Sequence, residues 1–101
     1  MRLVFSSPAA QDLEAIIDYI AEDNPAAAVK VADAIQAAAE RLLTFPDMGR
    51  VGRLPDTREL VVADLPYMIV YQVKPDAVVV LAVFRGARDL ARALSERQSP
   101  H

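Results

Sequence analysis

The sequence predicts a two-layer α+β domain in which one strand is followed by two helices, a three-stranded antiparallel meander and a short C-terminal helix. Three observations predict it. Two segments that begin at a proline carry apolar residues at helical spacing. Three later segments are rich in β-branched residues, and the connections between them are short and contain turn-forming residues. Two amphipathic helices can bury their apolar stripes against one face of such a sheet.

The first strand is expected at residues 2–6, directly before the first helix. Ser7-Pro8 predicts the helix start, because a serine side chain can accept a hydrogen bond from an unpaired N–H group and proline at the first helical position loses no bond. This helix extends to about Glu22. Its apolar stripe contains Leu13, Ile16, Ile17 and Ile20.

The second helix is expected at residues 25–44, because Asn24-Pro25 repeats the same start signal. Its many alanines permit close packing against the first helix, so the two form a helical hairpin with a very short joint. Residues 45–56 contain two prolines and two of the three glycines, which predicts a loop. A loop of this length in a small domain often has a function.

The meander strands and the last helix complete the predicted order. The strands are expected at residues 57–63, 67–73 and 77–84, the helix at residues 87–96, and a frayed end at residues 97–101. The last strand is apolar on both of its faces. It is therefore either central and covered twice, or part of its second face binds a partner. The small size of the chain favours the partner.

Composition limits the chemistry that the chain can perform. With 101 residues, the whole chain, 1–101, is expected to be one domain. It has no cysteine, and its only histidine is His101, which excludes thiolate and histidine metal sites and Ser-His-Asp catalysis. No phosphate-binding glycine loop is present either. We therefore expect neither a metal nor another cofactor. No apolar run reaches the roughly 20 residues of a membrane span, and no signal peptide is apparent, which predicts no membrane partner and a cytoplasmic location.

Charge is distributed unevenly along the chain. The net charge is −3, which does not favour general nucleic-acid binding. Acidic side chains dominate residues 1–47, and arginines dominate the rest. An arginine fork suits either a phosphate or the carboxylates of a partner, and pairing within the chain, for example with Glu59 or Asp89, is the structural alternative. The candidate arginines are Arg50, Arg53, Arg58, Arg85 and Arg88.

Two tyrosines are a second candidate feature. Tyr67 and Tyr71 are four residues apart on one predicted strand and therefore share a face. They can be core residues or aromatic residues of an interface, and the core is favoured.

The order of short motifs along nearly the whole chain resembles the RelE/ParE superfamily of toxins from type II toxin–antitoxin modules, and it resembles ParE more than RelE. The strand, helix, helix and meander order is the fold that this resemblance implies. The motifs that carry it are Ser7-Pro8-Ala9-Ala10, Asp12-Leu13, Tyr19-Ile20, Asn24-Pro25, Phe45-Pro46-Asp47-Met48-Gly49-Arg50, Thr57-Arg58-Glu59-Leu60, Pro66-Tyr67 and Val83-Phe84-Arg85-Gly86-Ala87-Arg88-Asp89.

The superfamily hosts two activities on one fold, so individual residues have to distinguish them. RelE-like members cut messenger RNA on the ribosome, and in them an arginine follows the tyrosine where Met68 follows Tyr67 here. Arginine stabilises charge but is a poor proton shuttle, which argues against a ribonuclease, so no catalytic residue is assigned. ParE-like members inhibit DNA gyrase through protein contact. The resemblance places Arg85 and Arg88 at the target contact, although many relatives have histidine where Arg85 stands.

The resemblance also implies a cognate ParD-like antitoxin, bound in a hetero-oligomer. Its acidic segment is expected to bind Arg50, Arg53, Arg58, Tyr67 and Tyr71. Sequence-specific DNA contact is expected from the antitoxin and not from this chain. Two alternatives remain open, namely a RelE-like, ribosome-dependent endoribonuclease and a non-toxic relic that retains only antitoxin binding.

Overall fold

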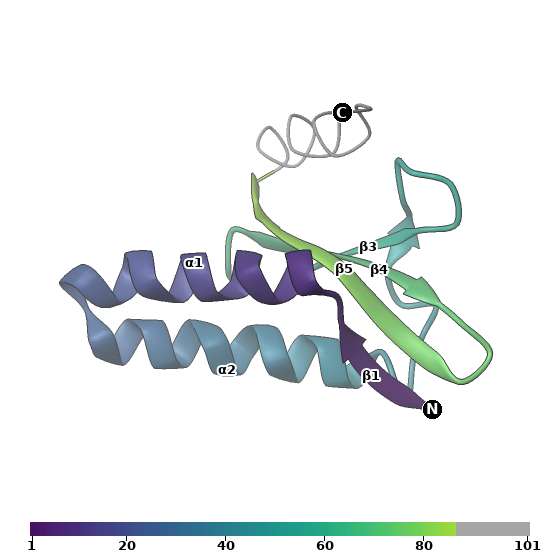
Figure 1. Ribbon diagram of the computed structural model, residues 1–101, viewed down its shortest axis with the longest axis horizontal. Coiled ribbons are helices and arrows are strands. Elements are labelled where there is room, and N and C mark those ends of the chain that lie inside the picture. The colour runs from purple at the N-terminus through teal and green to yellow at the C-terminus, as the bar shows by residue number, and fades with distance from the viewer. Residues whose placement is uncertain (87–101) are drawn as a thin grey trace.

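The computed structural model describes residues 1–86 and confirms the two-layer α+β prediction (Figure 1). The helix and frayed end predicted beyond residue 86, together with Arg88, lie outside the described residues. The elements in chain order are β1 (Arg2–Phe5), α1 (Ser7–Asp23), α2 (Pro25–Arg41), β2 (Arg50–Val51), β3 (Arg58–Val61), β4 (Tyr67–Val73) and β5 (Ala77–Arg85). The short strand β2, within the predicted loop, was not expected.

Side chains cap the start of both helices, although not in the way predicted for α1. The cap is Ser6 and not Ser7, because the Ser6 Oγ accepts a hydrogen bond from the Ala9 N–H at 3.2 Å. Asn24 ends α1 and begins α2. Its N–H donates to the Ile20 carbonyl at 2.9 Å, and its Oδ1 accepts from the Ala27 N–H at 3.1 Å. One residue therefore joins the two helices of the hairpin.

The second helix ends earlier than predicted. It stops at Arg41 and not at residue 44. The N–H groups of residues 42–44 donate to carbonyls three positions back, and not four as in an α-helix. The Leu42 N–H, for example, donates to the Ala39 carbonyl at 3.1 Å. This narrower geometry is common where a helix ends, and here it turns the chain toward the sheet.

The sheet has five strands in the order β1-β5-β4-β3-β2. The strand β1 runs parallel to β5, and the other neighbours are antiparallel. Val70 pairs with Ala82 and Tyr71 with Val80, which leaves Leu81 as an extra residue in a bulge of β5. Side chains near the start of α1 bind this bulge, since Ser6 Oγ donates to the Leu81 carbonyl at 3.2 Å and Asp12 Oδ2 accepts from the Val83 N–H at 3.0 Å.

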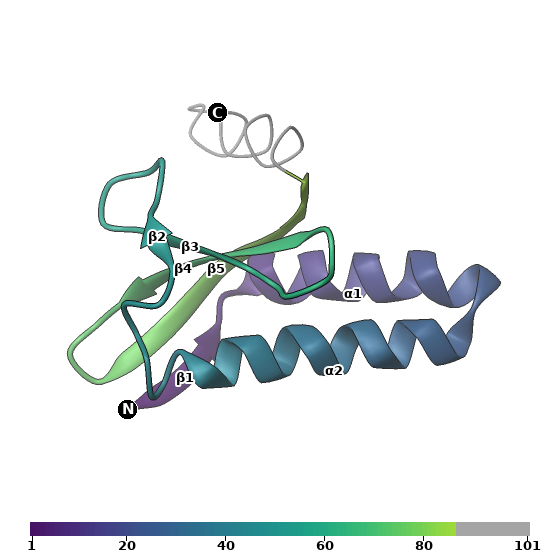
Figure 2. The same cartoon turned by 180° about the vertical axis from the view of Figure 1, so that it is seen from behind.

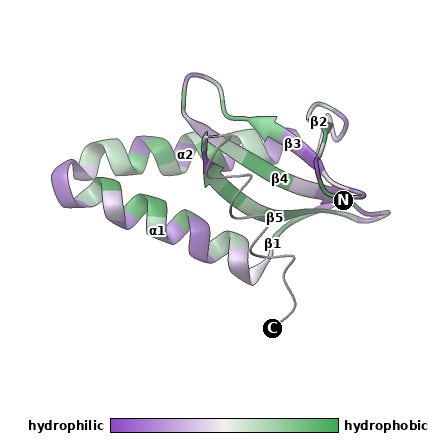
Figure 3. Cartoon of the chain, turned by 90° about the horizontal axis from the view of Figure 1, so that it is seen from above, coloured by the Kyte–Doolittle hydropathy of each residue, from purple (hydrophilic) through white to green (hydrophobic). Residues whose placement is uncertain are grey.

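The main core lies between the helical hairpin and the sheet. Figure 3 shows hydrophobic residues along β4 and β5, and α1 packs on β5 while α2 contacts β4. Its fully buried side chains include Ile35, Leu42, Ile69, Tyr71, Val78 and Val80. In residues 1–86, neither helix has the length and hydropathy that a bilayer span requires.

A smaller cluster covers the second face of the sheet. Its four side chains are buried, and Leu54 packs against them. They are Met68, Val70, Ala82 and Phe84. The expectation that this face is left for a partner is therefore wrong at these positions, because the chain itself covers them. The strand β5 lies between β1 and β4, and its residues from Ala77 to Phe84 are buried except for Val79 and Leu81, which are half-buried.

Candidate protein-binding site

The hydroxyl of Tyr71 holds the loop that carries the predicted arginines. It donates to the Pro46 carbonyl at 2.7 Å and accepts from the Gly49 N–H at 2.9 Å. Gly49 is required here, because a Cβ at this position would lie 2.7 Å from the Tyr71 hydroxyl and 2.8 Å from the Glu59 carbonyl oxygen. The loop is thus tied to the centre of the sheet at its base.

Replacing Tyr71 tests whether these two hydrogen bonds hold the loop. Tyr71→Phe removes both hydrogen bonds and is expected to lower the free energy of unfolding by about 1–2 kcal/mol. Urea unfolding measures the loss. Tyr19→Phe serves as the control, because Tyr19 is exposed. Equal stability of the two variants would contradict a stabilising role of the Tyr71 hydroxyl.

The same substitution has a pH signature. Burial raises the pKa of the Tyr71 hydroxyl above its usual value of 10.0, although the Gly49 N–H and the nearby Arg58 oppose the shift. The neutral hydroxyl therefore stabilises the fold fully below pH 10, and that contribution is lost as the pH rises through the raised pKa. Melting temperatures measured at increasing pH above 10 are expected to fall less steeply for Tyr71→Phe than for the parent chain.

Glu59 of β3 is a buried carboxylate that binds residues of β2 and of the loop after it. Its side chain is 1% exposed, and it accepts from the Arg50 guanidinium at 3.2 Å and from the Arg53 backbone N–H at 2.9 Å. A buried charge without such partners would be costly. The Arg50 side chain is 60% exposed, so it satisfies Glu59 and still reaches solvent. Pairing of an arginine within the chain, the alternative to contact with a partner, is thus present for Arg50 and Glu59.

Arg58 binds the same loop from β3. Its guanidinium donates to the Gly49 carbonyl at 2.8 Å, and its Nη2 lies 3.5 Å from the Asp47 carboxylate. Asp47 is well exposed, and Arg58 is partly exposed. Arg58 therefore supports the loop and presents charge at its surface.

The structure gathers some of the predicted site residues and separates others. The Arg50 side chain and the Arg53 backbone N–H bind Glu59, whereas Arg58, the residue before Glu59 on β3, lies on the opposite face of that strand and binds Gly49 and Asp47. The three arginines come from β2, from the loop that follows it and from β3, and β2 lies beside β3 (Figure 2). We call these three residues the arginine cluster. Tyr71 is fully buried and Tyr67 is 8% exposed, so the two rings offer little surface for direct contact with a partner. Arg85 is exposed and pairs with Tyr67 at the opposite end of β4 from the cluster.

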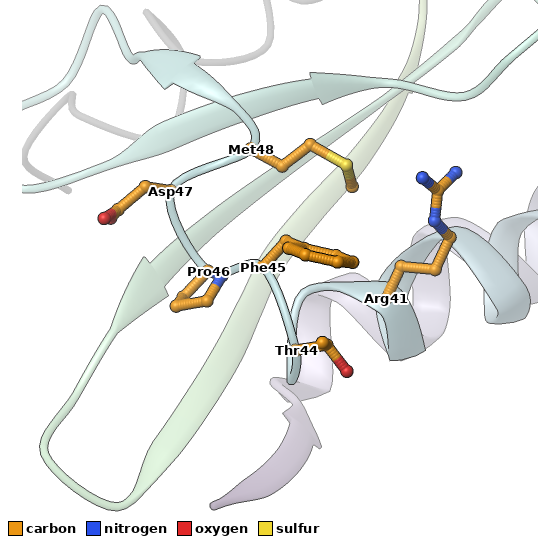
Figure 4. Close-up of a pocket in the computed structure, with 6 residues that line it drawn as sticks. All are labelled: Arg41, Thr44, Phe45, Pro46, Asp47 and Met48. Atoms are coloured by element: carbon orange, nitrogen blue, oxygen red, sulfur yellow. The ribbon is translucent and has the colours of Figure 1, made fainter.

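An open hollow lies where α2 ends and the loop begins. Figure 4 shows the side chains of Arg41, Phe45 and Met48 on the same side of the loop, whereas Asp47 points away from them. Phe45 is 56% exposed. An exposed aromatic ring beside a guanidinium is a typical anchor point for a protein partner.

A second hollow continues along α2 to the edge of β3 and shares Arg41 and Met48 with the first. Its other lining residues are Ala34, Ala37, Ala38, Leu60, Val61, Val62 and Ala63. We call the two hollows together the α2–β3 groove. This groove was not expected from the sequence, although the spacing of Ala34, Ala37 and Ala38, at i, i+3 and i+4, indicates one face of small residues on α2.

The edge of β3 beside this groove is open. β2 covers only Arg58 and Glu59, and in the register of residues 1–86 no strand pairs with Val61 on that side. Val61 is 59% exposed. Such an edge presents unpaired backbone groups to an incoming strand.

The groups around the loop are suited to binding. Among residues 1–86, no cluster of histidine, cysteine, aspartate or glutamate side chains could hold a metal ion. The Tyr71 hydroxyl is buried, with both of its hydrogen bonds made inside the chain. The accessible groups are guanidinium groups, apolar side chains and an open strand edge, which recognise carboxylates and extended chains.

Comparison with known proteins agrees with the fold. Residues 3–90 match the family model described as the ParE toxin of the type II toxin–antitoxin system parDE. Toxin RelE2 of Caulobacter vibrioides is 37% identical over 87 residues, which cover 86% of this chain and 97% of that protein. The protein Y4kP of Sinorhizobium fredii is 41% identical over 75 residues, or 74% of this chain and 78% of that protein.

Solved structures of two systems are also similar. A chain from the chromosomal ParDE system of P. aeruginosa superimposes with a TM-score of 0.77 at 27% identity, covering 85% of this chain and 96% of that chain. A chain of the intact E. coli RelBE toxin–antitoxin complex gives a TM-score of 0.61 at 19% identity, with the same coverage. The second likeness concerns the fold alone.

Proposed function

Because the chain belongs to the ParE toxin family of type II toxin–antitoxin systems, we propose that it is a toxin that inhibits DNA gyrase by protein contact and is neutralised by a cognate antitoxin. One observation carries the choice of a contact inhibitor. The hydroxyl of Tyr71, which holds the loop that carries Arg50, is buried and bonded twice within the chain. Guanidinium groups stabilise charge but do not shuttle protons at neutral pH.

The antitoxin is proposed to bind at the arginine cluster and the α2–β3 groove. An extended antitoxin segment would pair with the open edge of β3 at Val61, place apolar side chains in the groove and direct carboxylates toward Arg50, Arg53 and Arg58. Tyr71 contributes indirectly, by holding the loop that carries Arg50. The target contact is proposed to include Arg85, at the other end of the sheet.

A supercoiling assay tests the proposal. Purified chain is added to gyrase, relaxed plasmid and ATP, with and without its antitoxin. We expect loss of supercoiling or accumulation of linear DNA, and reversal of the effect by the antitoxin. Normal supercoiling in the presence of excess folded chain would contradict gyrase inhibition.

A ribosome-dependent endoribonuclease is the second candidate, favoured by the relative named RelE2. Primer extension on translated messages distinguishes the two. Cuts at A-site codons within minutes of induction would support the ribonuclease, and intact messages during growth arrest would support gyrase inhibition. A chain that co-purifies with its antitoxin but leaves growth unchanged would be a non-toxic relic.

A further inference from the structure

A separate hollow lies on the helical hairpin, at residues to which neither the antitoxin nor the target contact is assigned above. Phe5 of β1 and Gln36 of α2 form part of its lining. The remaining lining residues all come from α1 and are Ala10, Leu13, Glu14, Ile17 and Asp18. Their spacing, at i, i+3, i+4, i+7 and i+8, places them on one face of the helix. We call this hollow the hairpin groove.

The floor of the hairpin groove is apolar and firmly held. Phe5 and Leu13 pack against the main core while part of each side chain remains exposed, and Ile17 is also only half-buried. Covering these side chains would remove apolar surface from water, which favours association.

The rim of the groove is acidic. Glu14 and Asp18 are exposed, and the ion pairs found in residues 1–86 use other carboxylates, those of Asp47, Glu59 and Asp76. Helix α1 contains five acidic residues and no basic residue. An apolar floor with an acidic rim matches a segment that presents apolar side chains flanked by lysine or arginine.

The hairpin groove and the α2–β3 groove lie on different sides of α2. Gln36 lines the first, whereas Ala34 and Ala38, each two positions away, line the second. Two positions along a helix correspond to a rotation of about 200°. The hairpin groove is therefore separate from the basic surface proposed for the antitoxin, and its charge is of opposite sign.

We infer that the hairpin groove binds a short, basic amphipathic segment of the protein that the toxin inhibits. This inference rests on the proposed function as a toxin. It assigns target recognition to Glu14, Ile17 and Asp18 on α1. The partner's apolar side chains occupy the floor, and its lysines or arginines pair with the two carboxylates.

A charge-reversal pair tests the inference. In Glu14→Lys/Asp18→Lys, the toxin level needed to arrest growth is expected to rise at least tenfold, because the rim would repel a basic segment. The antitoxin dissociation constant is expected to change less than twofold. The matched control is Glu22→Lys/Asp23→Lys, which makes the same charge change at exposed residues of α1 outside the groove. It is expected to arrest growth as the parent chain does.

A second variant avoids any change of charge. Ala10→Trp places a large ring at an exposed position of the groove and is expected to weaken growth arrest similarly. Circular dichroism confirms folding, and Ala10→Trp decides the question if the charge variant is unfolded. Full growth arrest by the folded variants would overturn the inference, as would equal effects of the groove and control pairs. Growth arrest by the parent chain with normal gyrase activity would contradict the gyrase proposal alone, because the growth assay does not depend on the identity of the target.

Discussion

Ile35→Asp is expected to abolish folding. Ile35 is 0% exposed and lies in the main core, between the hairpin and the sheet. An unpaired carboxylate there would cost several kcal/mol, either as a buried charge or through displacement of the helix. The total stability of a small domain is about 5–15 kcal/mol, so one such change consumes much of it.

Far-UV circular dichroism and a thermal melt measure the effect. The parent chain is expected to melt cooperatively. Ile35→Asp is expected to lack the helical spectrum at 25 °C and to show no cooperative transition on heating. Gln36→Asp is the matched control, since it introduces the same side chain at the next, exposed position of the helix. A normal melt for Ile35→Asp would mean that α2 buries a different face.

Arg58→Glu is expected to weaken antitoxin binding about 100-fold, which corresponds to about 2.7 kcal/mol. The substitution removes the bond to the Gly49 carbonyl and places a second carboxylate beside that of Asp47. An acidic antitoxin segment would then meet like charge in place of attraction. Titration calorimetry with purified antitoxin measures the change.

Two controls distinguish direct contact of Arg58 with the antitoxin from an indirect effect of Arg58 through the loop that it supports. Arg85→Glu makes the same charge change at the other end of the sheet and is expected to leave antitoxin affinity within twofold. Tyr71→Phe loosens the same loop without changing its charge, and its affinity is expected to stay within fivefold. An unchanged dissociation constant for Arg58→Glu would remove Arg58 from the interface.

The local elements of the fold could be predicted because local residues determine them. Proline and the polar cap residues indicate where α1 and α2 begin, and β-branched runs with short turns indicate the meander. The cap assignment missed by one residue, since Ser6 and Ser7 both precede Pro8 and only the backbone geometry selects between them. The end of α2 was placed three residues late because apolar Leu42 continues the helical pattern into a tighter turn.

The long-range features could not be predicted in the same way. Strand β2 has only two residues and exists because Arg50 and Val51 meet β3, and the groove beside it depends on how α2 lies against that strand. The spacing of Tyr67 and Tyr71 placed both on one face, and the structure shows that this is the core face. Clustering of Arg50 and Arg53 around Glu59 depends on the path of the loop, which no periodic pattern records.

The parallel pairing of β1 with β5 has a consequence for the nascent chain. Residues Arg2–Phe5 find their partners only at residues 77–80, so the first strand has no place in the sheet until the last strand has been synthesised. Contacts this distant in sequence form late and slowly. A toxin built in this way cannot complete its fold while most of it is still being translated. The complete five-stranded sheet is therefore available to a partner only after β5 has been synthesised.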